Sequence, residues 1–229
     1  MPKNPEPRFS IRPIVFPAPP PILNAEVSMR QTHSVRWSVI ASAMVAAALW
    51  AWPSVAAAQS VSGNASAARV TTFGLSGSTT VLADTGALGG TSDARDASQV
   101  TASVPSVLSG EVLSATTIGW PDQVASEASL ASLSLSVGGT GISADFVMAT
   151  ATAVLGAAGS GTSLIDNLST GGVPIAVTGE PNQTISIPGG QVVINEQAVS
   201  AAGTTVNALH ASVTGVADVV IGSATAGIQ

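Results

Sequence analysis

Apolar and polar residues alternate one by one near the middle of the chain, from Ser126 to Gly139. Leu133, Leu135 and Val137 are separated by single serines. A period of two places such residues on one face of a β-strand. The glycines of the stretch 138–141 then predict a hairpin turn.

The segment after this turn, Ile142 to Ala153, predicts the second strand of the hairpin. We expect Phe146 and Met148 to share the apolar face with Ile142 and Ala144, because all four stand at even spacing. Both strands are about twice the usual length. That length is typical of strands in the middle of a sandwich.

The C-terminal third, Gly189 to Ile228, is rich in β-branched residues and glycine and contains no proline, lysine, arginine or aromatic residue. Val and Ile suit a half-buried pleated surface, and Gly suits the turns between strands. Three runs therefore predict three successive strands: Val192–Ile194, Thr204–Val206 and Val219–Ile221.

Shorter runs separated by turn residues predict the remaining strands. A first hairpin is expected around Ser76 and Gly77, and a polar surface loop from Asp84 to Val104. The Gly-Trp-Pro-Asp sequence at 119–122 predicts a turn, with Pro at a favoured position. The predicted strands are Val70–Leu75, Ser78–Ala83, Glu111–Ile118, Ser163–Leu168, Val173–Thr178 and Thr184–Ile187.

Together these elements predict an all-β domain over residues 59–229 with no helix-length period. We expect an antiparallel, jelly-roll-like β-sandwich of about nine or ten strands. The alternative is a β-solenoid. A solenoid requires a repeat of constant length, and the sequence contains none that we can find.

The N-terminus has two parts of different composition. Residues 1–28 are rich in proline and predict a disordered extension. Residues 29–58 predict a signal peptide: Arg30 and Arg36 precede an uncharged apolar run of 16 residues from 37 to 52, and small residues precede Gln59. We expect Met29 to be the biological start and cleavage to fall between Ala58 and Gln59.

A membrane-spanning helix is the alternative reading of this apolar run. A span needs about 20 residues, more than the run offers, and no basic stop-transfer cluster follows it. We therefore expect export without a stable membrane span after signal cleavage. The protein is then extracellular, at the cell surface or in the periplasm.

Charge and cysteine content exclude several classes of function. Residues 59–229 contain two arginines against eleven carboxylates, a net charge of −9. Such a chain does not neutralise phosphates, which argues against nucleic-acid binding. The absence of cysteine excludes disulfides, thiolate metal sites and a cysteine nucleophile.

Few residues could carry chemistry. His210 would need a nearby Ser or Thr and an acid such as Asp218 to act as a base. Alternation places it on the wetter strand face, where a structural or solvated histidine is expected. Asp84, Asp93 and Asp96 could offer oxygens to Ca²⁺, but their spacing fits neither an EF-hand nor a G-G-x-G-x-D repeat, and a solvated acidic loop is expected. We expect no catalytic, cofactor or metal site.

Aromatic residues are scarce after residue 58. Phe73 and Phe146 lie on predicted strands and are expected in the core. Trp120 is the one candidate ligand contact, because an exposed indole could stack on a sugar. We expect it instead to plug one end of the sandwich.

Several stretches resemble the choice-of-anchor P family of bacterial proteins. These are TTIGWPDQVASEASLASLSL (116–135), GISADFVMATA (141–151), PNQTISIPGGQVVINEQ (181–197), TVNALH (205–210) and GVADVVIGSATAGI (215–228). The resemblance implies an exported surface or extracellular domain and supplies no catalytic motif. The C-terminal anchoring signal of the family is not apparent after Ile228, so we expect free secretion or a periplasmic location.

These features predict a non-enzymatic structural, surface or matrix protein. The first alternative is an adhesin-like module that binds a glycan or a protein, with envelope or matrix polysaccharide or a surface protein as the partner. The remaining alternative is a hydrolase of an extracellular polymer, which would need paired carboxylates across a cleft.

Overall fold

The computed structural model describes residues 59–74, 77–200 and 203–229. The chain divides into two compact units, Met1–Val55 and Ala56–Gln229, and all described residues belong to the second. The predicted proline-rich extension and signal peptide, residues 1–58, lie outside the described residues. Among the described residues, no helix has the length and apolar character needed to cross a membrane.

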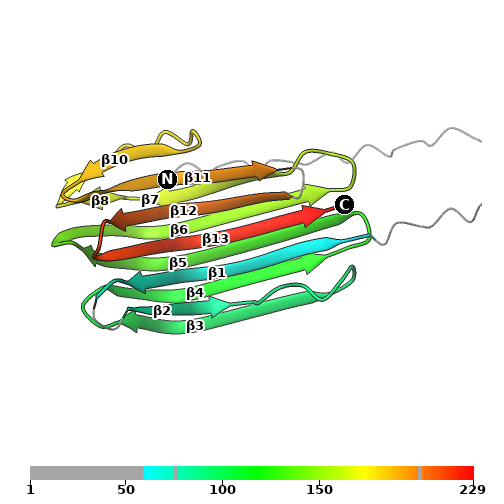
Figure 1. Ribbon diagram of the computed structural model, residues 1–229, viewed down its shortest axis with the longest axis horizontal. Helices are drawn as coiled ribbons and strands as arrows, with labels where there is room; N and C mark the ends of the chain where they lie inside the picture. The colour runs from blue at the N-terminus through cyan, green and yellow to red at the C-terminus, as the bar shows by residue number, and fades with distance from the viewer. Residues whose placement is uncertain (1–58, 75–76, 201–202) are drawn as a thin grey trace, which may run out of the picture. The chain divides into compact units, whose positions relative to one another are not determined.

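The described chain is built from β-strands joined by turns and short connections (Figure 1). Along the chain the strands are β1 (Val61–Thr72), β2 (Ser78–Asp84), β3 (Ala94–Val104), β4 (Leu108–Gly119), β5 (Gln123–Val137), β6 (Thr140–Val154), β7 (Ser160–Asp166), β8 (Ser169–Thr170), β9 (Val173–Pro174), β10 (Gln183–Ile187), β11 (Gly190–Ser200), β12 (Gly203–Val213) and β13 (Ala217–Ile228).

The strands form two antiparallel sheets, which we call sheet A and sheet B. Sheet A has the order β10-β11-β12-β13-β1-β2, and sheet B has the order β3-β4-β5-β6-β8-β9 with β7 also paired to β6. Strand β13 packs across the interface on β5 and β6. This arrangement confirms the predicted all-β sandwich and excludes the solenoid.

Most neighbouring strands are also neighbours in sequence, so each sheet is largely a meander rather than the Greek keys of a jelly roll. The pairing of β13 with β1 joins the two ends of the described chain within sheet A. At the margin of this pair, Ser60 and Gln229 exchange two backbone hydrogen bonds of 3.0 Å.

The strongest sequence patterns are confirmed. Strands β5 and β6 form a long hairpin with Val137 opposite Thr140, and Gly138 and Gly139 both adopt the positive φ of a two-residue turn. Strands β11, β12 and β13 are the three strands predicted in the C-terminal third. Strands β1 and β2 pair as the predicted first hairpin, but β1 spans Val61–Thr72 rather than Val70–Leu75, and residues 75–76 of the expected turn region lie outside the described residues.

The prediction of a surface loop from Asp84 to Val104 is wrong over most of its length. Strand β3 occupies its second half and pairs with β4 from Ala94 opposite Ile118 to Val104 opposite Leu108. The pattern was missed because β3 is an edge strand whose residues are mostly exposed, so it shows no alternation of apolar and polar residues.

In several strands the alternation of core-facing and outward-facing residues shifts by one residue about half-way along the strand. In β5, both Leu130 and Leu133 are buried, and Ser132 between them has a φ of 51°. Val112 of β4 has a φ of 49° and lies where the pairing of β4 with β5 shifts register. A residue in this conformation breaks the strict alternation of a strand and is typical of a bulge.

The same change of phase corrects the prediction for β6. Ile142 and Ala144 are buried as expected, but Val147 is also buried, so Phe146 and Met148 lie on the outer face of sheet B and are only partly buried. Phe73 follows the end of β1 and is half exposed. The expectation that Phe73 and Phe146 belong to the core is therefore wrong.

The two sheets are joined by a buried polar contact near one end. Ser126 Oγ of β5 donates to the backbone oxygen of Thr225 of β13 over 2.6 Å. Its hydroxyl also shares a 2.7 Å hydrogen bond with Thr117 Oγ1 of β4. Ala65 of β1, Ala115 of β4 and Ala128 of β5 form a separate buried cluster, and they lie on the same strands as this contact or on the neighbour of β13. Small residues here let the sheets approach closely enough for a direct bond.

Candidate functional site

His210 lies on the outer face of sheet A between two carboxylates. Its Nδ1 is 3.0 Å from both oxygens of Glu196 on β11, and its Nε2 is 2.8 Å from Oδ2 of Asp218 on β13. The prediction that His210 occupies the wetter face is confirmed, because its neighbours Leu209 and Ala211 are fully buried. The three side chains link three adjacent strands.

This geometry favours a charged ring. Ionised carboxylate oxygens only accept hydrogen bonds, so both contacts are hydrogen bonds only when the imidazole is protonated and both ring nitrogens donate. Partial burial lowers the pKa of His210, but the hydrogen bonds to Asp218 and Glu196 outweigh it, and the pKa is raised above its usual value. A protonated ring with both nitrogens occupied is not set up to accept a proton from a serine or threonine.

The ionic cluster continues as a chain of hydrogen bonds across the sheet. Asn207 Nδ2 of β12 donates to Glu196 Oε2 over 2.6 Å. Ser223 Oγ of β13 donates to Asn207 Oδ1 over 2.7 Å. Asp218 was foreseen as the partner of His210 and Glu196 was not. Finding Glu196 requires the register of β11 and β12, which pairs it with Asn207.

Hydroxyl groups pair across strands on both outer faces. In sheet A, Thr71 faces Thr79 and Thr205 faces Thr225, each with 3.0 Å between hydroxyl oxygens. In sheet B, 2.9 Å separates the hydroxyls of Ser143 and Ser169, and 3.0 Å those of Thr150 and Thr162. Such neutral pairs are among the side-chain contacts that stabilise sheets.

Trp120 lies in the turn between β4 and β5, where its backbone N–H donates to the oxygen of Gln123 over 2.7 Å. Trp120 as a whole residue is 41% exposed, so the expectation that it plugs the sandwich is wrong. The turn after β6 lies alongside, because Leu155 N–H donates to the oxygen of Asp122 over 2.9 Å. Val154, the last residue of β6, and Leu155, which follows it, are also exposed, so three large apolar residues lie in or next to these two adjacent turns.

The side chain of Gln59 reaches the same turn, where its Nε2 donates to the backbone oxygen of Pro121. Gln59 is the residue expected at the N-terminus after signal cleavage. Its neighbour across the expected cleavage bond, Ala58, lies outside the described residues. The exposed turn around Trp120 is thus close to the start of the described chain.

Two of the three aspartates considered for Ca²⁺, Asp84 and Asp93, have separate partners, and Asp96 lies exposed on β3. Asp84 accepts from Asn64 Nδ2 over 3.2 Å, and Asp93 is 2.9 Å from Arg95 Nε. The hydrogen bond from Gly89 N–H and the bond from Arg95 lower the pKa of Asp93. Within the described part of the chain, no group of three or more His, Cys, Asp or Glu side chains is placed to hold a metal ion.

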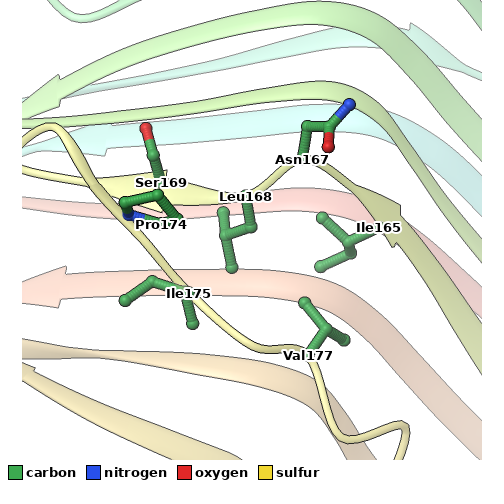
Figure 2. A pocket seen from close by; sticks show the side chains of 7 residues that line it. All are labelled: Ile165, Asn167, Leu168, Ser169, Pro174, Ile175 and Val177. Atoms are coloured by element: carbon green, nitrogen blue, oxygen red, sulfur yellow. The ribbon is translucent and has the colours of Figure 1, made fainter.

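A shallow pocket of about 410 Å³ lies beside the connection from sheet B to sheet A. Figure 2 shows aliphatic side chains turned into it from β7 and from the segment after β9. The amide of Asn167 at its margin donates to Asp145 Oδ2 over 2.7 Å. The pocket is lined by Ile165, Asn167, Leu168, Ser169, Pro174, Ile175 and Val177. This lining offers apolar contact area rather than acid–base groups.

The fold and these features define the class as an all-β, two-sheet antiparallel sandwich. Searches against protein-family models, curated proteins and solved structures found no match to the chain. The choice-of-anchor P resemblance therefore remains a hypothesis drawn from the sequence.

Proposed function

We propose that this protein is an exported, non-enzymatic β-sandwich with a structural role at the bacterial cell surface or in the extracellular matrix. The observation that carries the proposal is the pairing of neutral hydroxyls across strands on both outer faces. Hydroxyl pairs do not titrate near neutral pH, and salt does not screen them as it screens ion pairs. A protein exposed to changing external conditions benefits from such a surface.

Two further features support this role. The signal-peptide pattern of residues 29–58 accounts for delivery to the outside. The sole histidine of residues 59–229 binds two carboxylates and so ties together β11, β12 and β13. A histidine used in this way contributes to the integrity of the sheet.

The location is tested by fractionating a bacterium that expresses the full chain. Mass spectrometry of the exported fraction should find a protein that begins at Gln59, and translation from Met29 alone should give the same product. Protein that stays in the cytoplasm with residues 1–58 attached would contradict the proposal.

The structural role is tested by deleting the gene. The deletion should weaken the surface layer or matrix and leave the breakdown of extracellular polymers unchanged. A deletion strain that instead accumulates an undegraded extracellular polymer would favour the hydrolase alternative.

The exposure of Trp120 favours a second candidate, a module that binds a glycan or a protein partner through the turn at 119–122. An exposed indole provides a flat apolar surface for a sugar ring. Trp120 is the only tryptophan after residue 58, so its fluorescence reports on this turn alone. Addition of envelope or matrix polysaccharide should shift the emission and saturate. Unchanged emission, together with equal polysaccharide retention by Trp120→Ala, would argue against glycan binding at this turn.

A further inference from the structure

Strand β3 is the long edge of sheet B. It has eleven residues and, in the described chain, pairs with β4 alone. The other outer strands of the two sheets are shorter: β2 and β7 have seven residues each, β10 has five, and β9 has two and ends at Pro174. The outer side of an edge strand presents N–H and C=O groups that another strand can bind.

The segment from Ala97 to Val104 lacks two of the devices that usually prevent pairing, because it contains no charged residue and no proline. Its register with β4 is the same on both sides of Val100, the one position of the segment where the pairing is interrupted. Val100 lies in the centre of this segment and is 80% exposed, the highest value among the large hydrophobic side chains of the described residues. An exposed valine on an uncharged edge favours pairing with another strand.

Along the segment 97–104, core-facing and outward-facing residues follow a palindromic order, which reads the same from either end. Four of its residues pair with buried residues of β4 and so lie on the core-facing side of sheet B: Ala97, Ala102 and Val104, which are partly buried, and Gln99, which is exposed. The other four face outward: Ser98, Val100, Thr101 and Ser103. Beside Val112 of β4 the alternation of core-facing and outward-facing positions shifts by one residue. Two outward-facing residues, Val100 and Thr101, are therefore consecutive in the centre of the segment. The order of inward and outward residues is therefore the same in both directions.

We propose that β3 is the interface for a second copy of this chain, which adds its own β3 in antiparallel orientation. The two-fold axis passes between Val100 and Thr101, so that Val100 lies opposite Thr101 of the second copy. Ala97 then lies opposite Val104, and Ser98 opposite Ser103. Each core-facing residue meets a core-facing residue, and the two B sheets become one continuous sheet. A shift of one position would place core-facing residues opposite outward ones.

A second copy fits this edge better than an unrelated partner does. An isologous two-fold interface requires a surface that is complementary to itself, and the palindromic order supplies it. Residues 59–229 carry a net charge of −9, so two copies repel each other over most of their surface. The uncharged segment from Ala97 to Val104 is a place where they meet without that cost. The inference depends on the edge alone and does not require export.

The register is tested by disulfide trapping in the full chain, which contains no native cysteine. Ser98→Cys and Ser103→Cys chains are purified separately, mixed and mildly oxidised. Directly opposite residues lie about 4.5–5.5 Å apart, within the reach of a disulfide. The mixture should form a covalent dimer. Ser98→Cys alone should not, because its two cysteines would be about 17 Å apart along the strands.

The edge itself is tested by sedimentation of the full chain and of Val100→Lys. The unsubstituted protein should form a concentration-dependent dimer, and the exposed lysine should shift it to monomer without unfolding it. Val173→Lys is the matched control, because Val173 is also well exposed on an edge strand, and its dimer should persist. A monomer at every concentration would overturn the inference. So would a dimer that Val100→Lys leaves intact, or cross-linking of Ser98→Cys alone that equals the mixture.

Discussion

The ionic cluster around His210 should make the stability of the protein depend on pH in a defined direction. The pKa of His210 is raised in the folded protein, so folding favours the protonated ring. Its contribution is therefore fully present below the unfolded pKa of about 6.5. It is lost as pH rises through the higher folded pKa. Stability should therefore fall as pH rises above about 6.5 and level off once the folded pKa is passed.

The solvent exposure of the three side chains limits how much their contacts contribute to the free energy of unfolding. The side chains of His210, Glu196 and Asp218 are 23%, 31% and 34% exposed, so solvent still screens both ion pairs. Exposed pairs contribute about 0.2–1 kcal/mol each, and charge-assisted hydrogen bonds somewhat more. Together the two contacts should contribute about 1–2 kcal/mol. For a domain of this size, each kcal/mol shifts the Tm by roughly 2–4 °C.

The assay is chemical denaturation of the protein and of His210→Gln at a series of pH values. The glutamine keeps one amide donor but does not titrate, so His210→Gln should be less stable than the unsubstituted protein at low pH. The two should converge as pH rises. Glu196→Gln serves as a control that removes one carboxylate and should show a smaller slope. Parallel curves for the unsubstituted protein and His210→Gln would refute the reasoning.

Three further predictions concern packing and exposure. Gly161→Ala should destabilise the fold by about 1–3 kcal/mol, because the added Cβ would lie 2.8 Å from the oxygen of Thr150 and against the side chain of Val206. Gly141→Ala, with nothing within 4 Å of the added atom, should change stability by less than about 0.5 kcal/mol in the same denaturation assay. Ser126→Ala should cost about 1–3 kcal/mol, because it leaves the buried Thr117 hydroxyl and the oxygen of Thr225 without their partner; an equal unfolding midpoint would contradict this. Trp120 should emit at long wavelength in the folded protein, and Trp120→Ala should cost less than about 2 kcal/mol rather than the roughly 3–5 kcal/mol of a buried tryptophan.

Local patterns in the sequence were enough to predict the all-β class and the central strands. The hairpin of β5 and β6 could be predicted because alternation and a Gly-Gly turn are properties of adjacent residues. Strands β11 to β13 could be predicted for the same reason, since β-branched runs and glycines lie within each segment. The wetter face of His210 also follows from alternation alone.

Features that depend on pairing were decided by the tertiary structure. Strand β3 has little apolar character of its own and is held as a strand by its hydrogen bonds to β4. The outward position of Phe146 follows from a change of phase in β4, β5 and β6, where Val112 and Ser132 adopt positive φ. No local pattern predicts such a change, because it reflects how neighbouring strands bend together.

The candidate site also combines features that the sequence predicts with features that only the tertiary structure decides. The sequence by itself placed Trp120 in a turn and named Asp218 as the acid for His210. Only the packed sheets exposed Trp120 and brought Glu196 to the other ring nitrogen of His210, where its hydrogen bond helps to raise the pKa of the histidine. The physical reason is that turn and strand propensities act over a few residues, whereas register and burial are set by residues far apart in the chain.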